Sequence, residues 1–170
     1  MNKMFRGTEL AANVAIVLVG ILLSVVLVKN NLVQSQPAIA APAAAIAPGT
    51  KLSLPGVDWK TNGRTLVLAL STGCRFCTES APFYKRLAQE KPNLQNIRLV
   101  AVFPEPEEQS RKYLSDLGVT VDEVRQGRLD SIGVVGTPTL IFADADGAVA
   151  TSWRGKLSSD KETEVLARLK

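Results

Sequence analysis

The chain has 170 residues, of which 46% are hydrophobic and 21% charged, and this balance predicts one globular domain plus an additional segment. The net charge is +4 and no basic stripe with interleaved aromatic residues occurs, which excludes the usual nucleic-acid-binding proteins. Histidine is absent, so the commonest general base and zinc ligand is missing, as is any Cys-His or Ser-His-Asp nucleophile system. The available chemistry is that of thiols, carboxylates and the backbone.

An uncharged apolar run occupies residues 10–28, after a short N-terminal segment of residues 1–9. As a helix the run would span about 28 Å, close to the ~30 Å hydrocarbon core of a membrane. It is longer than the apolar region of a secretory signal, so the sequence favours an uncleaved anchor, with a cleaved signal as the alternative. Lys3 and Arg6 place the N-terminus in the cytoplasm by the positive-inside bias. The sequence thus predicts a single-pass protein of the cytoplasmic (inner) membrane, with its C-terminal domain facing the periplasm or the cell exterior.

A linker rich in alanine covers residues 29–50 and contains Pro37, Pro42 and Pro48. It has no helical or strand period, and its prolines favour extended, semi-rigid backbone. We interpret it as a stalk between the anchor and a domain of residues 51–170.

Strand and helix patterns alternate within the domain. A continuous apolar run predicts a strand covered on both faces, and the other elements follow from their hydrophobic periods and turn signals. The order predicts an α/β or α+β sandwich with a core that needs no disulfide staple. The predicted strands are residues 65–70, 97–103, 139–142 and 148–153, and the predicted helices are residues 75–90, 107–117 and 159–169.

The two cysteines of the chain, Cys74 and Cys77, follow the first predicted strand and open the first helix. The partial positive charge of a helix N-terminus stabilises a thiolate, and Arg75 adds a full charge beside it. We therefore expect Cys74 to have a lowered pKa and to be the attacking thiolate. Cys77, one turn later, would be the resolving thiol, and Arg75 would tune the pKa.

Other roles for the pair are open. A zinc site needs about four ligands, and two cysteines without histidine could supply only part of a shared intermolecular site, so we predict no metal and no other cofactor. A structural disulfide or two inert buried thiols remain alternatives, because exported domains often carry bridges. The position at a helix start favours a redox-active dithiol.

Two stretches resemble thioredoxin. The sequence STGCRFCTESAPF, residues 71–83, resembles the thioredoxin active-site helix, including its kink proline at Pro82. The sequence VVGTPTLIF, residues 134–142, resembles the thioredoxin segment whose proline is cis. The resemblance covers the whole C-terminal domain and implies a thioredoxin-like fold, a central mixed sheet flanked by helices. It also implies that Pro138 sits against the dithiol and that the backbone at Thr137 binds an extended substrate segment.

Within this superfamily the chain resembles the membrane-anchored TlpA/ResA-type proteins. The long stretch of residues 104–124 fits the extra helix and strand that such tethered members carry. The resemblance implies a thiol–disulfide oxidoreductase that reduces disulfides of exported proteins, apocytochrome c among them. It also implies a membrane electron donor of the CcdA/DsbD type as redox partner.

The chain departs from the family pattern around the dithiol. Gly73 replaces the tryptophan that commonly precedes the first cysteine, and Leu68 replaces the buried acid of thioredoxin. No carboxylate is therefore evidently placed to take the proton from Cys77, and we interpret nearby Glu79 as a solvated surface charge. The acidic residues before the second helix are interpreted as enriching its first turn, where the dipole favours negative charge: Glu105, Glu107 and Glu108.

Three other functions remain open. A thiolate stabilised by Arg75 would favour a dithiol oxidase, whereas the anchor and the inserted helix and strand favour a reductase. A thiol peroxidase of the same fold lacks support, because Val67 and Ser71 stand where its Pro-x-x-x-Thr-x-x-Cys pattern has proline and threonine, and Leu68 is not proline either. A non-enzymatic thioredoxin-like binding module is the last alternative.

Overall fold

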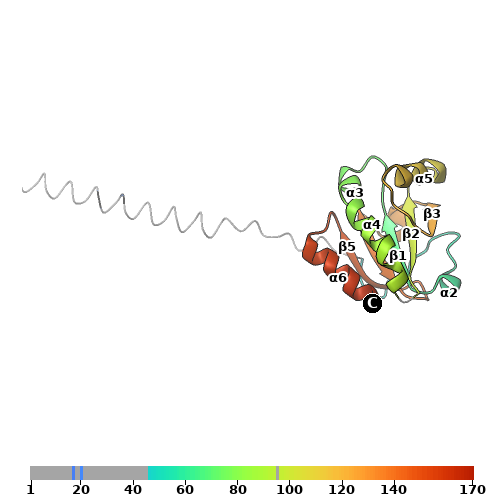
Figure 1. Cartoon of the computed structure of the whole chain (residues 1–170). Coiled ribbons are helices and arrows are strands. Elements are labelled where there is room, and N and C mark those ends of the chain that lie inside the picture. The colour runs from blue at the N-terminus through green and yellow to red at the C-terminus, as the bar shows by residue number, and fades with distance from the viewer. Residues whose placement is uncertain (1–16, 18–19, 21–45, 95) are drawn as a thin grey trace, which may run out of the picture. The chain divides into compact units, whose positions relative to one another are not determined.

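The structure, a computed structural model, describes these residues of the chain: Val17, Gly20, 46–94 and 96–170 (Figure 1). The chain divides into two units after Ala41, and the fold given below is that of the second. Apart from Val17 and Gly20, the predicted anchor lies outside the described residues, and so does most of the predicted linker. Within the described part of the chain, no helix has the length and apolar character needed to span a membrane.

A five-stranded mixed sheet with the order β3-β2-β1-β4-β5 forms the centre of the domain. β1, β2 and β3 run parallel to one another, whereas β4 is antiparallel to both β1 and β5. The elements in chain order are α2 (Trp59–Asn62), β1 (Thr65–Ala69), α3 (Arg75–Glu79), α4 (Ala81–Glu90), η1 (Lys91–Asn93), β2 (Arg98–Phe103), α5 (Glu107–Asp116), β3 (Glu123–Gln126), η2 (Asp130–Ile132), β4 (Thr139–Ala143), β5 (Val149–Arg154) and α6 (Ser159–Leu169).

The central strand β1 is buried along its whole length. Leu66 and Leu68 pack in one hydrophobic core with side chains of α4, α5 and α6, and Figure 1 shows these helices around the sheet. Val67 and Ala69 pack in a second core on the other face, beneath residues 46–59 and 129–134. Burial on both faces explains why the strand reads as a continuous apolar run without alternation. The predicted mixed α/β architecture is confirmed.

The helix predicted over residues 75–90 is broken at Ser80 into α3 and α4. The Ser80 hydroxyl donates a hydrogen bond to the Phe76 carbonyl at 2.8 Å and closes the last turn of α3. Pro82 then occupies the first turn of α4, where a missing N–H costs no intrahelical hydrogen bond. The prediction of one continuous helix was wrong at this point, and the break lies beside the proline that the resemblance identifies as the kink.

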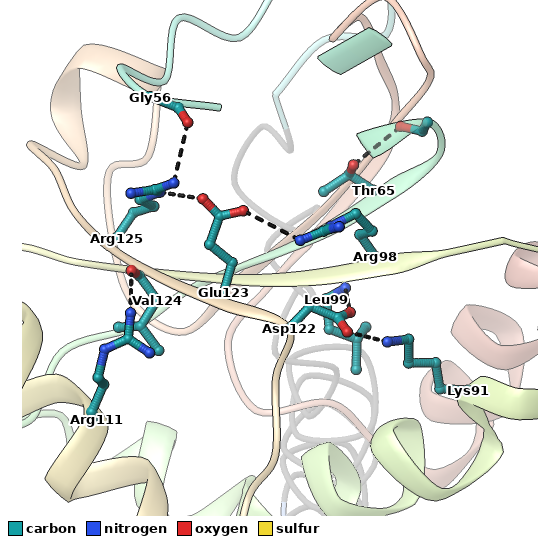
Figure 2. A network of polar contacts seen from close by, with 11 residues as sticks. Gly56, Thr65, Lys91, Arg98, Leu99, Arg111, Asp122, Glu123, Val124 and Arg125 are labelled. Atoms are coloured by element: carbon teal, nitrogen blue, oxygen red, sulfur yellow. Dashed lines mark hydrogen bonds and ion pairs between the residues drawn. The ribbon is translucent and has the colours of Figure 1, made fainter. Parts of the chain in front are cut away.

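The inserted segment forms the predicted helix and strand, α5 and β3. Figure 2 shows the polar network that ties β3 to the sheet: Asp122 pairs with Lys91, and Glu123 lies between Arg98 and Arg125. β3 is an edge strand, and charged side chains protect such an edge from pairing with another chain. The network has a structural role.

The end of the predicted linker lies on the domain. The amide of Gly49 donates to the Val149 carbonyl at 2.8 Å, and the Ser152 hydroxyl donates to the Ile46 carbonyl at 3.2 Å. The Ile46 side chain also packs against the second core. Residues 46–50 therefore cover the outer strand β5, which would otherwise present an unpaired edge.

We expect Gly147→Ala to destabilise the domain by about 2–4 kcal/mol, the combined cost of a left-handed residue with a side chain and of overpacking. Gly147 has φ +71°, and an added Cβ would lie 2.8 Å from the Trp59 ring. The matched control is Gly49→Ala, which has φ +84° but open space around it and should lose only about 1–2 kcal/mol. Denaturant unfolding of both variants measures the difference, and equal losses would contradict the role of the Trp59 contact.

Candidate active site

Cys74 is the N-cap residue of α3. Its backbone is extended, with φ −88° and ψ 108°, and its Sγ accepts the amide hydrogen of Cys77 at 3.2 Å. The side chain is partly exposed, as an attacking group must be. Strand β1 ends at Ala69, so the short connection to α3 holds this sulfur at the carboxyl edge of the sheet.

The environment of Cys74 lowers the pKa of its thiol. Partial burial is the largest single influence and raises the pKa, but hydrogen bonds to the thiolate outweigh it. These come from the Cys77 thiol, the Thr137 side chain and the amides of Cys77 and Phe76. Hydrogen bonding to the charged form favours that form, and it acts here at the positive end of a helix. This direction agrees with the lowering that the sequence predicts for Cys74.

Cys77 has the opposite environment. Its residue is fully buried, and burial raises the pKa of its thiol to about 12, with the adjacent Cys74 sulfur acting in the same direction. A hydrogen bond from the Ser71 backbone amide acts against this shift. Both cysteines are free thiols. The pair thus consists of one accessible sulfur that ionises readily and one enclosed sulfur that keeps its proton.

The segment before β4 brings Thr137 and Pro138 to the dithiol. The Thr137–Pro138 peptide bond is cis, as the resemblance implies. The Cys74 thiol donates a hydrogen bond to the Thr137 carbonyl at 3.4 Å. The Pro138 carbonyl accepts the amide hydrogen of Gly155 at 2.7 Å, which fixes this segment to the chain that follows β5.

Arg75 is not among the main influences on the pKa of Cys74, although the sequence predicts that it tunes this pKa. Its side chain is 85% exposed and binds Glu79 at 2.6 Å, one turn along α3. Glu79 also binds Lys156 at 2.9 Å, so its carboxylate belongs to a surface ion-pair group. Arg75 is directed to this partner, and the pKa of Cys74 is lowered by the hydrogen bonds given above. The interpretation of Glu79 as a surface charge agrees with its place.

Glu105 is a residue of the site that the sequence interpretation missed. It precedes α5 and does not belong to its first turn, whereas Glu107 and Glu108 do. Its Oε1 accepts hydrogen bonds from the Ser71 hydroxyl at 2.7 Å and from the Thr72 amide at 3.1 Å. A carboxylate from the end of β2 therefore holds the loop that leads from β1 to Cys74.

Chemically the site can exchange thiols with disulfides. A thiolate at Cys74 can attack a disulfide, and Cys77 lies one turn away to displace the mixed disulfide, which transfers two electrons. Among the described residues, no group of three or more His, Cys, Asp or Glu side chains could hold a metal ion. Thiol–disulfide exchange at this site needs the two sulfurs and a proton acceptor.

The fold and the Cys-x-x-Cys pair are those of thioredoxin-like thiol–disulfide oxidoreductases. No protein-family model matches the chain, and no curated protein sequence does so either. The chain is similar to the solved thioredoxin domain of a thiol–disulfide oxidoreductase from Bacteroides vulgatus, with TM-score 0.57 and 19% identity over 74% of this chain and 99% of that one.

Two further solved structures are similar. A protein of Chlorobium tepidum assigned as thiol:disulfide interchange protein DsbE matches with TM-score 0.51 and 25% identity, over 65% of this chain and 83% of that one. A secreted disulfide oxidoreductase of Mycobacterium tuberculosis, homologous to E. coli DsbE, matches with TM-score 0.52 and 17% identity, over 64% and 83%. The thioredoxin-like fold inferred from the two sequence stretches is thus confirmed.

Proposed function

We propose that the chain is a membrane-anchored, extracytoplasmic enzyme that reduces disulfides of exported proteins. The observation that carries the proposal is the unequal dithiol: Cys74 at the start of α3 with a lowered pKa, and Cys77 buried one turn later. The apolar run of residues 10–28 supports the anchor. The secreted state of the Mycobacterium tuberculosis protein is consistent with an exported domain.

The surface beside Cys74 suits an extended protein segment. The two large apolar side chains exposed on the described domain are Phe76, 54% exposed, and Val135, 78% exposed. Phe76 lies between the cysteines, and Val135 lies two residues before Thr137, whose carbonyl is 3.4 Å from Cys74 Sγ. Apolar contacts and backbone hydrogen bonds along Thr137 would hold a substrate strand so that its disulfide reaches Cys74. Cysteines of apocytochrome c and of other exported proteins are the proposed substrates.

The direction of the reaction follows from what stabilises the reduced state. A lowered Cys74 pKa stabilises the reduced form and by itself favours an oxidase, which is the second candidate function. Arg75, the feature that most favoured an oxidase, is paired with Glu79. The apolar run of residues 10–28 and the inserted α5 and β3, which resemble those of tethered reductases, support the reducing direction. We therefore propose the reductase, which a membrane electron donor of the CcdA/DsbD type would keep reduced.

Acid-quenched thiol trapping of the protein in its own cells tests the direction, and we expect both cysteines to be mainly free thiols. A reagent that adds a fixed mass per thiol reads the state directly. A mainly disulfide-bonded population would overturn the reductase. Reducibility by glutathione would then separate an oxidase from a structural bridge, because structural disulfides resist reduction by glutathione. Deletion of the membrane electron donor should convert the free thiols into the disulfide.

A further inference from the structure

Release of a reduced substrate requires Cys77 to lose its proton. After Cys74 has attacked, the mixed disulfide joins Cys74 to the substrate, and only the thiolate of Cys77 can displace the substrate sulfur. The buried Cys77 thiol has a pKa of about 12 in the reduced protein, so about one molecule in 10⁵ carries this thiolate at pH 7. A proton acceptor near the sulfur would remove this limitation.

The phenols and the surface carboxylate near the dithiol cannot accept this proton. Burial raises the pKa of the Tyr84 phenol on α4 and that of the Tyr113 phenol on α5. Both phenols therefore keep their protons at neutral pH. Glu79 on α3 lies in ion pairs with Lys156 and Arg75, which hold the pKa of its carboxyl below its usual range and make it a weak base.

Glu105 has an unused carboxylate oxygen. The bonds from Ser71 and Thr72 all reach Oε1, where the Thr72 hydroxyl adds a third donor at 3.2 Å. Oε2 is buried and has no hydrogen-bond partner among the described residues. A buried oxygen without a partner costs about 1–3 kcal/mol, and the loop is already held by Oε1. A purely structural role for Glu105 leaves this oxygen unexplained.

Two observations link Glu105 to the dithiol. Ser71 connects them, because its hydroxyl donates to Glu105 at 2.7 Å and its carbonyl accepts the amide hydrogen of Cys74 at 3.2 Å. The Ser71 backbone amide also acts to lower the pKa of the Cys77 thiol. The Tyr113 phenol gives the second observation: burial is the main cause of its raised pKa, and charges on both cysteines and on Glu105 raise it further. The Tyr113 phenol therefore feels the charges of both sulfurs and of the carboxylate, and its oxygen lies 2.9 Å from the Thr78 hydroxyl on α3.

We propose that Glu105 accepts the proton of Cys77 when the mixed disulfide is resolved; this inference rests on the proposed function. The Cys77 S–H bond breaks and its proton passes to the carboxylate, which becomes a carboxylic acid. The Cys77 sulfur then forms the bond to Cys74 Sγ, and the bond from Cys74 to the substrate sulfur breaks, which releases a substrate thiolate. The protein is oxidised by two electrons and the substrate disulfide is reduced. When a donor reduces the protein again, Glu105 returns the proton to Cys77.

A coloured aryl disulfide, bis(nitrobenzoate) disulfide, separates the two steps in the detergent-solubilised full chain. Attack by Cys74 releases one coloured thiolate at a rate that depends on reagent concentration. Resolution by Cys77 releases the second at a rate that does not. Glu105→Gln keeps an oxygen acceptor for Ser71 and Thr72 but removes the base. Glu108→Gln is the matched control, since it removes the same charge from an exposed position in the first turn of α5.

We expect Glu105→Gln to slow the second phase by about 10²-fold at pH 7, at the lower end of general base catalysis, while the first phase stays within a few-fold. The second phase should then rise about tenfold per pH unit, because solvent hydroxide has to ionise Cys77. Glu105→Asp should recover part of the rate, and Glu108→Gln should match the unmodified protein.

Equal second phases in Glu105→Gln and Glu108→Gln, with equal pH profiles, would overturn the proposal and leave the proposed function standing. A lost first phase in Glu105→Gln would show that the loop has collapsed. The pH profile of the unmodified protein then tests the proposal. If its second phase already rises tenfold per pH unit, no internal base acts on Cys77 and the proposal is overturned. If the unmodified protein releases only one thiolate, the proposed oxidoreductase function itself fails.

Discussion

We expect Cys74→Ser to reduce disulfide exchange by this protein to the uncatalysed background. Cys74 is the accessible sulfur at the N-cap of α3, and its Sγ accepts the amide hydrogen of Cys77 at 3.2 Å. A serine hydroxyl at this position does not ionise near neutral pH and cannot attack a disulfide. The remaining Cys77 is fully buried and cannot replace it. Turnover of a protein disulfide with a chemical reductant as electron source measures the loss.

Cys77→Ser should retain the first step and stop at the mixed disulfide, because no second sulfur is present to displace the substrate. The trapped species can be isolated from cells after acid quenching, and a reducing agent should release the bound proteins. The control is the double Cys→Ala variant, which should trap nothing. Full rescue of a deletion strain by that double variant would instead favour a non-enzymatic binding module. An absence of mixed disulfides in Cys77→Ser would contradict the two-step mechanism.

The sequence predicts the central part of this site because its determinants are local. A continuous apolar run identifies β1, and the cysteines one short turn later are thereby placed at a helix N-terminus, where a thiolate is stabilised. The segment with Thr137 and Pro138 lies 63 residues after Cys74, and its contact with that sulfur followed from the thioredoxin resemblance alone. Composition and hydrophobic periodicity cannot predict this contact between Thr137 and Cys74.

Two charged side chains, Arg75 and Glu105, have partners other than those that the sequence interpretation gave them. Arg75 was assigned to Cys74 by adjacency, but a flexible side chain on a helix surface reaches a carboxylate four residues away, and Glu79 has that spacing. Glu105 was assigned to a helix start by composition. Its flanking prolines, Pro104 and Pro106, are a signal that could have separated it from α5, since a proline at the N-cap excludes the preceding residue from the helix. Its bond to Ser71, 34 residues away, required the fold.

The two thiols should differ in alkylation rate by about 10² at pH 7, a value set by two opposing effects. Cys77, with a pKa of about 12, has about 10³-fold less thiolate than an ordinary thiol, whereas the Cys74 pKa is lowered and its thiolate fraction is larger. The more basic Cys77 thiolate is intrinsically more nucleophilic, with a Brønsted coefficient of about 0.4–0.5, which offsets part of this difference. Ionisation therefore outweighs nucleophilicity, and Cys74 reacts first.

The pH dependence of the alkylation rate should also distinguish Cys74 from Cys77, and the direction of the difference follows from the two pKa shifts. A lowered pKa means that the Cys74 rate, measured in Cys77→Ser, reaches its plateau at a lower pH than that of an ordinary thiol. A raised pKa means that the Cys77 rate, measured in Cys74→Ser, keeps rising about tenfold per pH unit well above pH 9. Burial, the main cause of the Cys77 shift, persists in Cys74→Ser, so the contrast should survive the loss of the neighbouring sulfur. Parallel profiles would instead place both sulfurs in similar surroundings, and the division into an attacking and a resolving thiol would fail.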